Sequence, residues 1–427
     1  MRPKILIVYH QYAFPLRSTV RDLLYAYRKY ADAECVYLNT AGRRTLPEVY
    51  TEQSWDLIIF HTVFISLRWG GDAEYENVRK LLAPLQTHPA KKIVMPQDEW
   101  IHTNILTRFI KDFHINAVFS VAPPSEWGKI YAGVDRSRVS FHYVLTGYIE
   151  QAVVDLVASK GHSSRTVDIG YRAYKAPPWL GRHGFLKTDI ADVFNRRAPA
   201  QGFSTDISTD ERDTIVGDGW YDFLLRCKYF IGLEGGSTVI DPDGSIWAKG
   251  TAYMQEHPGA GFEEVEAAVF PGMDGNLNLI AISPRHLECC ITRTAQVLME
   301  GDYNGILKAG EHYIELKKDY SNLDEVFRLM QDESLRQTLT ENAYRDIVDS
   351  RRYHYESFVA YVLNDAIGYQ PATPTAFETS LSRKMARAEE RYNRNLTLKA
   401  RIFRQLMPLR GLYRKSGLKT VFKLIKK

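Results

Sequence analysis

The stretch KILIVY, residues 4–9, decides the fold class, because it is a short apolar run without polar alternation. Similar runs recur further along the chain: DLIIFH (56–61), KKIVMP (91–96) and AVFSV (117–121). Strands buried on both faces, as in parallel sheets, have this pattern. Helix-like stretches such as residues 20–30 and 74–85 separate the runs. The sequence therefore predicts a doubly wound, parallel α/β sheet over residues 1–150.

The same pattern restarts in the second part of the chain. The apolar runs are VDIGY (167–171), YFIGL (229–233), NLIAIS (278–283) and HYIEL (312–316). Helices are expected near residues 287–298, 323–331 and 334–349. We predict a second doubly wound domain over residues 151–352, which faces the first across a cleft. A helix within residues 353–370 is expected to pack back on the first domain.

Length and composition favour a soluble protein of two domains. The chain has 427 residues, of which 45% are hydrophobic and 25% charged, so it has enough apolar surface for two cores. The predicted first strand begins almost at residue 1, without the features of a signal peptide. No stretch has about 18 uninterrupted apolar residues, so a membrane-spanning helix is not expected. The four cysteines show no metal-ligand spacing. A cytoplasmic location is therefore expected.

The carboxyl-terminal segment differs in charge from the rest of the chain. From Leu381 onward it has fifteen Lys and Arg against Glu389 and Glu390, whereas the whole chain has a net charge of +4. In LKTVFKLIKK (418–427) the apolar residues fall on one helical face, with lysines around them. We interpret residues 371–427 as a linker and a basic amphipathic tail for an anionic membrane surface. A nucleic-acid-binding tail or a disordered solubilising arm is the alternative, although no RNA-binding module accompanies it, and nucleic acid is not the expected partner.

The segment SPRHLE, residues 283–288, sets an arginine and a glutamate at a strand-to-helix junction. Helix amino termini expose unpaired N–H groups and a partial positive charge, which suit a phosphate. Arg285 can hold a phosphate through two hydrogen bonds, and Glu288 can accept hydrogen bonds from the two hydroxyls of a ribose. The segment therefore favours a nucleotide ligand. The same six residues also fit an ordinary helix start with a capping acid.

SPRHLE and two stretches that follow it, ITRTAQVLMEGDYNGILKAGEHYIELKKDYSNLDEV and ESLRQTLTENAYRDIVDSRRYHYESFV, resemble the carboxyl-terminal half of GT-B glycosyltransferases. The resemblance covers residues 167–359 and is looser in the first domain. It implies two Rossmann-like domains, with a nucleotide-sugar donor on the second and an acceptor on the first. It matches Glu288 with the glutamate that binds the donor ribose and Arg285 with the neighbouring arginine, and it places Asp319 and Asn322 where the family closes the nucleotide pocket. The sequence departs from the family after Glu288, because CCITRTAQ lacks the family's glycine.

Further donor-binding residues are predicted around the second sheet. The resemblance places Arg172 and Lys187 on the donor diphosphate, where positive charge stabilises the leaving group; solvated loop cations are the alternative. Glu234 directly follows a strand and precedes two glycines whose N–H groups can approach an anion. By resemblance to retaining enzymes, Glu234 is a candidate to face the transferring sugar, and a glycine-rich turn with a capping acid is the alternative. The other predicted donor-binding residues are Gly235, Gly236, Ser237 and His286.

Candidate catalytic and acceptor-binding residues follow the strands of the first domain. An inverting transferase needs a carboxylate or a histidine to take the proton of the acceptor hydroxyl. Asp98 is the preferred candidate, because an acidic pair at the end of a buried strand has little structural purpose. Glu99, His10 and His61 are the other candidates of this kind, and for each histidine the alternative is a buried side chain whose hydrogen bonds are made by the backbone. The predicted acceptor-side residues are Arg17, Thr19, Arg21, His61 and Glu99.

The sequence favours a transferase without a metal or another cofactor. Asp241 and Asp243 form the Asp-x-Asp triplet with which GT-A enzymes bind a metal, but such triplets are frequent in turns and the order of elements is not that of GT-A. Arg172, Lys187 and helix amino termini are expected to replace the metal. The predicted function is sugar transfer from a nucleotide donor to a glycan or lipid-linked acceptor, in bacterial surface polysaccharide biosynthesis. A sugar-nucleotide epimerase and a non-catalytic nucleotide- or glycan-binding scaffold are the alternatives.

Overall fold

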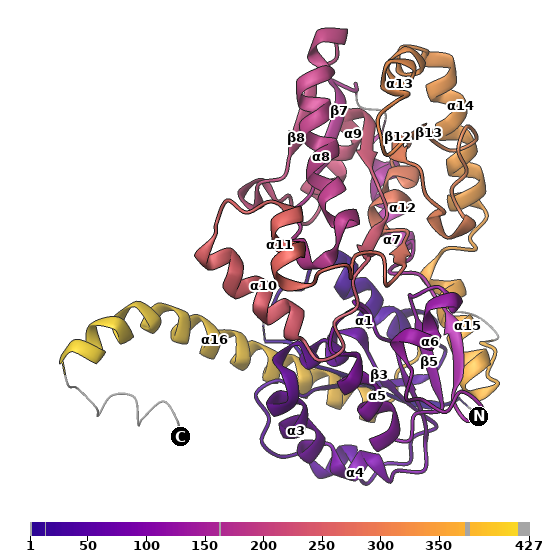
Figure 1. Cartoon of the computed structure of the whole chain (residues 1–427). Helices are drawn as coiled ribbons and strands as arrows, with labels where there is room; N and C mark the ends of the chain where they lie inside the picture. Colours follow the sequence, from indigo (N-terminus) through magenta and orange to yellow (C-terminus); the bar gives the residue numbers. More distant parts are fainter. Residues whose placement is uncertain (1, 13, 162–163, 372–375, 417–427) are drawn as a thin grey trace.

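The computed structural model describes residues 2–12, 14–161, 164–371 and 376–416, with side chains up to residue 399. It contains two α/β domains (Figure 1). The first domain has a sheet of six parallel strands in the order β2–β1–β3–β4–β5–β6. The strands are β1 (Lys4–Tyr9), β2 (Glu34–Asn39), β3 (Leu57–Phe60), β4 (Lys91–Val94), β5 (Ala117–Ser120) and β6 (Ser140–Tyr143). The central strands are almost completely buried, as their continuous apolar runs predict.

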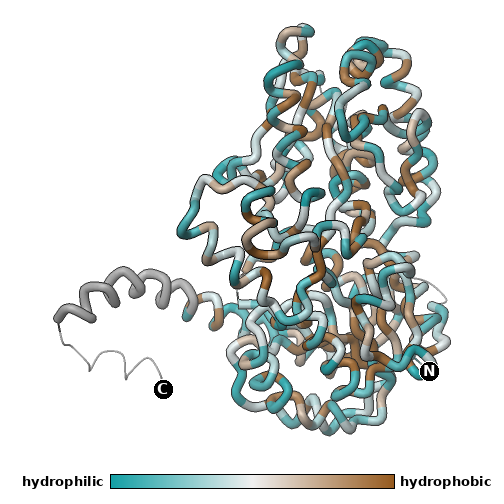
Figure 2. The backbone as a smooth tube through the Cα atoms, in the orientation of Figure 1, coloured by the Kyte–Doolittle hydropathy of each residue, from teal (hydrophilic) through white to brown (hydrophobic). Residues whose placement is uncertain are grey.

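The second domain has five parallel strands in the order β13–β12–β9–β7–β8. The strands are β7 (Val167–Arg172), β8 (Thr205–Ser208), β9 (Cys227–Gly232), β12 (Ala295–Met299) and β13 (Ile314–Leu316). Apolar residues concentrate along the strands of both sheets (Figure 2). The two doubly wound parallel domains expected from the sequence are confirmed.

Helices cover both sheets and connect the domains. In the first domain they include α1 (Ser18–Tyr30), α2 (Thr62–Ile65), α3 (Gly71–Leu81), α4 (Ala83–Gln86), α5 (Thr103–Asp112) and α6 (Trp127–Ile130). In and beside the second domain they are α7 (Gln151–Lys160), α8 (Arg182–Arg197), α9 (Gly219–Arg226), α12 (Pro284–Ile291), α13 (Leu323–Met330) and α14 (Glu333–Ala343). α15 (Tyr355–Ile367) returns to the first domain and packs on α1.

Each sheet has one place where the order of its strands reverses. β1 lies between β2 and β3 in the first sheet, and β7 lies between β8 and β9 in the second. Chain segments leave the carboxyl ends of neighbouring strands in opposite directions at such a switch point and open a crevice there. Two crevices are therefore available to build one site.

The segment after β9 differs from the prediction. NLIAIS was expected as a strand of the second sheet, but β11 (Leu279–Ala281) pairs antiparallel with β10 (Gly235–Ser237) outside it. An insertion between β10 and β11 carries α10 (Ser245–Glu256) and α11 (Phe262–Val269). The helix predicted over residues 287–298 ends at Ile291, and β12 follows, because Thr292 and Arg293 turn the chain and Ala295–Met299 is fully buried beside β9.

The carboxyl-terminal segment also differs from the prediction of a linker and tail. Phe377 forms a β-bridge with Glu34, and the first half of α16 (Ser380–Ser416) packs against β2. The buried face of α16 consists of Ser382, Met385, Glu389, Asn393 and Leu396. This face is largely polar, so its pattern did not reveal it as a packing surface. The predicted amphipathic stretch 418–427 lies outside the described residues.

Candidate active site

A cavity of about 490 Å³ lies between the two domains. Thr19 and Thr62 reach it from the segments after β1 and β3, and Tyr174 and Gly235 reach it from those after β7 and β9. The cavity is therefore built by both switch-point crevices. Proteins with open parallel sheets bind their ligands at this position.

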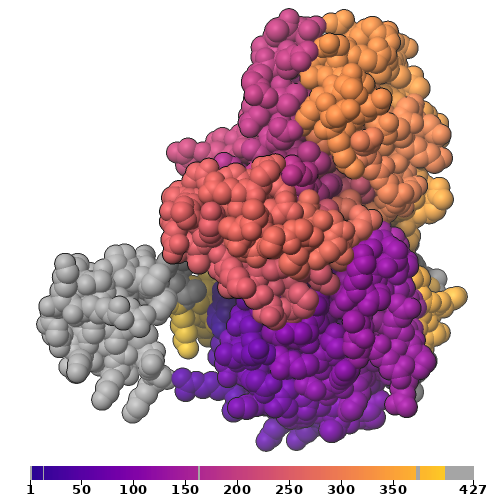
Figure 3. Space-filling view, viewed as in Figure 1, coloured from indigo at the N-terminus to yellow at the C-terminus, as the bar shows by residue number. Residues whose placement is uncertain are grey.

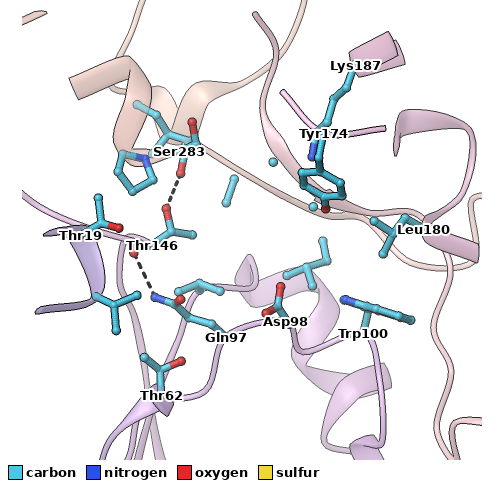
Figure 4. A pocket seen from close by; sticks show the side chains of 18 of the residues that line it. Thr19, Thr62, Gln97, Asp98, Trp100, Thr146, Tyr174, Leu180, Lys187 and Ser283 are labelled. Atoms are coloured by element: carbon cyan, nitrogen blue, oxygen red, sulfur yellow. Dashed lines mark hydrogen bonds between the residues drawn. The ribbon is translucent and has the colours of Figure 1, made fainter. Parts of the chain in front are cut away.

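Asp98 and Lys187 are the charged side chains among the described residues that line the cavity, and one comes from each domain (Figure 4). The Lys187 ammonium on α8 lies 5.6 Å from the centre of the Tyr174 ring. The pKa of Lys187 is lowered to about 8, mainly by burial and also by the nearby Arg285, while Asp98 opposes the shift. Burial raises the pKa of Asp98, while Arg68 and Lys187 act in the opposite direction. These two groups suit anion binding and proton transfer, respectively.

Arg68 fixes the loop that carries Asp98. Its guanidinium is buried and donates hydrogen bonds to the carbonyl oxygens of Ile65 (3.0 Å), Gln97 (2.7 Å), Asp98 (2.6 Å) and Ile101 (3.1 Å). Asp98 has a φ of 51°, which is costly for a residue other than glycine. Hydrogen bonds on both sides of Asp98 hold this conformation. Arg68 is a positioning residue that sequence reasoning missed, because nothing local relates it to a loop 30 residues later.

α12 brings the SPRHLE segment to the same cavity. Ser283 and Pro284 line it, and Ser283 caps the helix together with His286. The predicted donor-binding residue His286 is engaged in this cap, since its Nδ1 accepts a hydrogen bond from the Ser283 N–H at 3.1 Å, and burial lowers its pKa to about 3. Arg285 is exposed and close enough to Lys187 to lower its pKa.

Trp220 lies between the two residues predicted to bind the nucleotide. The Arg285 guanidinium carbon is 6.0 Å from the centre of the Trp220 ring. Glu288 is buried and accepts a hydrogen bond from the Trp220 indole N–H at 2.7 Å. Burial raises the pKa of Glu288, and the indole hydrogen bond opposes this shift. Arg285, Trp220 and Glu288 thus form one cluster that continues from Lys187 along the second domain.

Arg172 does not line the cavity, contrary to its predicted contact with a diphosphate. Its guanidinium donates to the Asp206 carboxylate at 2.6 Å and lies 4.5 Å from the centre of the Phe223 ring. β7 pairs with β8, and this pairing places Asp206 beside Arg172. The sequence does not reveal such a cross-strand partner.

Glu234 lies next to the cavity without lining it. Its carboxylate accepts hydrogen bonds from the N–H groups of Asp302 (3.2 Å) and Tyr303 (2.8 Å), and it therefore fixes the turn after β12. Gly235 and Gly236 do line the cavity. The other predicted donor residues are engaged in local structure: Ser237 bonds to the Val239 carbonyl, and Asp319 and Asn322 hold the turn between β13 and α13.

Of the predicted residues in the first domain, Asp98 and Thr19 line the cavity. Glu99 points into the core, where it accepts hydrogen bonds from Ser120, Val121, Ala122 and Tyr131. His61 caps α2 by accepting from the Val63 N–H, and His10 contacts Thr40. Arg17 is exposed at the start of α1, and Arg21 pairs with Asp22. Apart from Arg17, these side chains thus have partners within the first domain, and they do not line the cavity.

The Asp-x-Asp triplet is part of a helix start. The Asp241 carboxylate accepts a hydrogen bond from the Trp247 N–H at 2.8 Å, and that of Asp243 accepts from the Ser245 N–H at 3.0 Å. In the described part of the chain, no group of three or more His, Cys, Asp or Glu could hold a metal ion. The triplet thus has a structural use in the turn before α10.

The fold and the cavity define a two-domain α/β protein with a candidate ligand site between its domains. No family model and no curated protein matches the sequence. Solved structures similar in fold include a glycosyltransferase from Rickettsia africae, with 9% sequence identity and a TM-score of 0.45; the match covers 86% of this chain and 98% of that one. Another is HepE from Anabaena in complex with UDP and glucose, with 10% sequence identity and a TM-score of 0.44; the match covers 85% of this chain and 100% of HepE. TarM is also similar (12% identity, TM-score 0.36), and the match covers 72% of this chain and 54% of TarM.

In the described part of the chain, no helix combines the length and the apolarity that crossing a membrane requires.

Proposed function

We propose that this protein is a glycosyltransferase that uses a nucleotide-sugar donor. The main support is the cavity at the two switch points, to which the second domain contributes Lys187 and the first Asp98. Sugar transfer needs positive charge at the leaving diphosphate and, in an inverting reaction, a base at the acceptor hydroxyl. The cavity holds one group of each kind on opposite domains.

In this proposal the donor binds to the second domain. Lys187 and Arg285 hold the diphosphate, together with the N–H groups at the start of α12. Glu288 and Trp220 bind the nucleoside, and the donor sugar extends toward Asp98. These cations make a metal unnecessary for neutralising the diphosphate, so we expect activity to persist in EDTA.

Two measurements test the proposed function. The first is a thermal-shift screen against UDP, GDP, CMP, ADP and dTDP and their sugar derivatives. The second is release of nucleoside diphosphate from the stabilising donor in the presence of EDTA. Stabilisation and acceptor-dependent release support a transferase. Stabilisation without release would instead indicate a binding scaffold, and a changed sugar on an intact donor would indicate an epimerase.

The lowered pKa of Lys187 predicts how nucleotide affinity depends on pH. Because the pKa is about 8, Lys187 loses its charge as the pH rises through 8. Affinity for the bound nucleoside diphosphate should fall above this pH by up to about tenfold per unit. Lys187→Arg keeps its charge and should remove this dependence. Isothermal titration from pH 6.5 to 9.5 measures it, and equal slopes in both proteins would contradict the role of Lys187.

We also propose that the acceptor is a glycan or lipid-linked glycan of bacterial surface polysaccharide synthesis, reached at a membrane surface. The support is the exposed face of α16, which carries Arg383, Lys384, Arg387, Arg391 and Arg394. A helix with such a face is attracted to anionic lipid headgroups. Deleting the segment from Leu381 would be a poor test, because it also removes the buried face of α16.

Charge substitution is the sharper test of membrane association. Changing Arg383, Arg387 and Arg391 to Gln should lower binding to phosphatidylglycerol-containing vesicles about 10²-fold, since each cation contributes about 1 kcal/mol. The matched control changes three exposed cations elsewhere, Arg136, Arg138 and Lys249. Co-sedimentation measures binding, with phosphatidylcholine vesicles as the neutral reference. Equal loss in both triple variants would contradict a specific role of α16.

A further inference from the structure

Four tryptophans from both domains converge on one side of the interdomain cavity. Trp69 lies in the turn Ser66–Gly70, and Trp100 lies in the loop that also carries Asp98. Trp179 and Trp247 come from the second domain, from the turn Pro178–Leu180 and from α10. All four line the cavity. The ring centre of Trp69 is 5.7 Å from that of Trp100 and 6.0 Å from that of Trp247, with the rings edge to face.

The insertion between β10 and β11 builds this side of the cavity. Asp241 at its start exchanges backbone hydrogen bonds with the first domain, to the Trp100 carbonyl (2.6 Å) and from the His102 N–H (2.8 Å). The Asp241 carboxylate accepts from the Trp247 N–H and so fixes the start of α10. In the space-filling view the insertion lies directly against the first domain (Figure 3). The contact between the domains therefore also brings Trp247 to Trp69.

Gly250 on α10 allows Trp179 to pack closely. A Cβ atom at this position would lie 2.5 Å from Cε3 of the Trp179 ring, so a larger residue would displace the indole. The position of Trp179 thus depends on the insertion as well. The four indoles are held by packing before any ligand arrives, which reduces the entropy lost on binding.

The two sides of the cavity differ in chemistry. Figure 4 shows the polar side chains of Thr19, Thr146 and Gln97 on one side, and Tyr174 and Trp100 on the other, with Asp98 between them. The aromatic side lacks the several cations that a phosphate would need, since Lys187 is the positively charged residue among the described lining residues. An apolar surface of indole rings bordered by a carboxylate matches a sugar ring, which has apolar C–H faces and a hydroxyl edge. An aliphatic chain would instead leave the Asp98 carboxylate buried without a partner.

We propose that Trp69, Trp179 and Trp247 form the acceptor subsite, with the buried Trp100 supporting Trp69, and that they bind a pyranose ring through its C–H face, with a ring hydroxyl at Asp98. This proposal rests on the proposed function and names the acceptor as a carbohydrate at the reacting end. The subsite belongs to the acceptor because Trp100 shares its loop with Asp98, whereas the donor cations lie on α8 and α12. The insertion is then the element that determines acceptor specificity.

The test compares two variants of Trp247 in the full chain. Trp247→Tyr keeps an aromatic face and Trp247→Leu removes it. The probes are cellotriose, maltotriose, chitotriose and rhamnose-, galactose- and mannose-containing trisaccharides, with decanoate as an aliphatic probe. Binding is followed by isothermal titration in the presence of the nucleoside diphosphate that stabilises the protein. Trp127→Leu removes an indole away from the cavity and is the matched control.

We expect at least one trisaccharide to bind, with affinity lowered about tenfold or more in Trp247→Leu and less than about threefold in Trp247→Tyr and Trp127→Leu. Decanoate should not compete. Absence of binding by every trisaccharide, equal affinities in the Leu and Tyr variants, or binding of decanoate alone would each overturn the subsite. The nucleotide thermal shift is recorded on the same samples: if it persists, only the subsite fails, and if the unaltered protein shows none, the proposed function fails.

Discussion

Replacing Asp98 with Asn should lower kcat for sugar transfer by about 10²- to 10⁴-fold, the usual contribution of a general base. The amide keeps the shape of the side chain but cannot take the proton of the acceptor hydroxyl. Because burial raises the pKa of Asp98, the unaltered enzyme should lose activity as the pH falls through this raised pKa and the carboxylate becomes protonated. The Asn variant should lack this acidic limb. Steady-state rates of nucleoside diphosphate release between pH 4.5 and 8 measure both effects.

The design separates catalysis from binding and folding. Nucleotide binding should persist in Asp98→Asn, since the cations proposed to hold the donor remain in place on the other domain. Asp243→Asn is the matched control, because its carboxylate is exposed and caps the turn before α10. Retention of kcat within threefold and of the acidic limb in Asp98→Asn would show that another group takes the proton, as expected for a retaining reaction.

The contacts of Arg68 explain why Asp98 is suited to act as a base. Arg68 holds the backbone on both sides of Asp98 and also lowers its pKa. The guanidinium thus opposes the effect of burial on the carboxylate and fixes its direction. A single buried arginine couples the geometry of the loop to the proton affinity of its acid.

Sequence patterns predicted the parts of the fold that depend on local burial. Apolar runs such as KILIVY and VDIGY became central strands because both of their faces are covered. β12 was predicted as helix, since its residues AQVLM are compatible with either state and only its position beside β9 decides between them. Strands such as β2 and β8 were missed because they contain polar residues such as Glu34 and Asp206.

The site was predictable where it depends on topology and unpredictable where it depends on side-chain partners. Asp98, Lys187 and Thr19 follow strand ends and do line the cavity. Arg172 and Glu99 also lie at strand ends, but cross-strand or core partners engage them. The tryptophans were missed because three of them lie in turns and on an insertion that the pattern did not place. Tertiary neighbours therefore decide which strand-end residues face the ligand.

The buried carboxylate of Glu389 on α16 also has its partners on other elements of the first domain. Replacing Glu389 should therefore lower the free energy of unfolding strongly. Glu389 accepts hydrogen bonds from the Tyr9 hydroxyl and from Arg28 at 3.3 Å, and it is close to Tyr25. Glu389→Ala leaves the buried Tyr9 hydroxyl and the half-buried Arg28 without this acceptor. Leaving such groups without their hydrogen-bond partner costs about 1–3 kcal/mol. The adjacent Glu390 is exposed, and Glu390→Ala should change stability by less than about 0.5 kcal/mol.

Urea unfolding followed by circular dichroism measures this difference, with the first transition analysed because two domains need not unfold together. Glu389→Gln should fall between the two alanine variants, since it keeps one acceptor oxygen but not the charge opposite Arg28. Nucleotide binding should persist in the folded Glu389 variants, because the donor residues lie on the second domain. Equal unfolding midpoints for Glu389→Ala and Glu390→Ala would mean that α16 is not part of the folded first domain, and the basic face of α16 would then not be held in a fixed orientation.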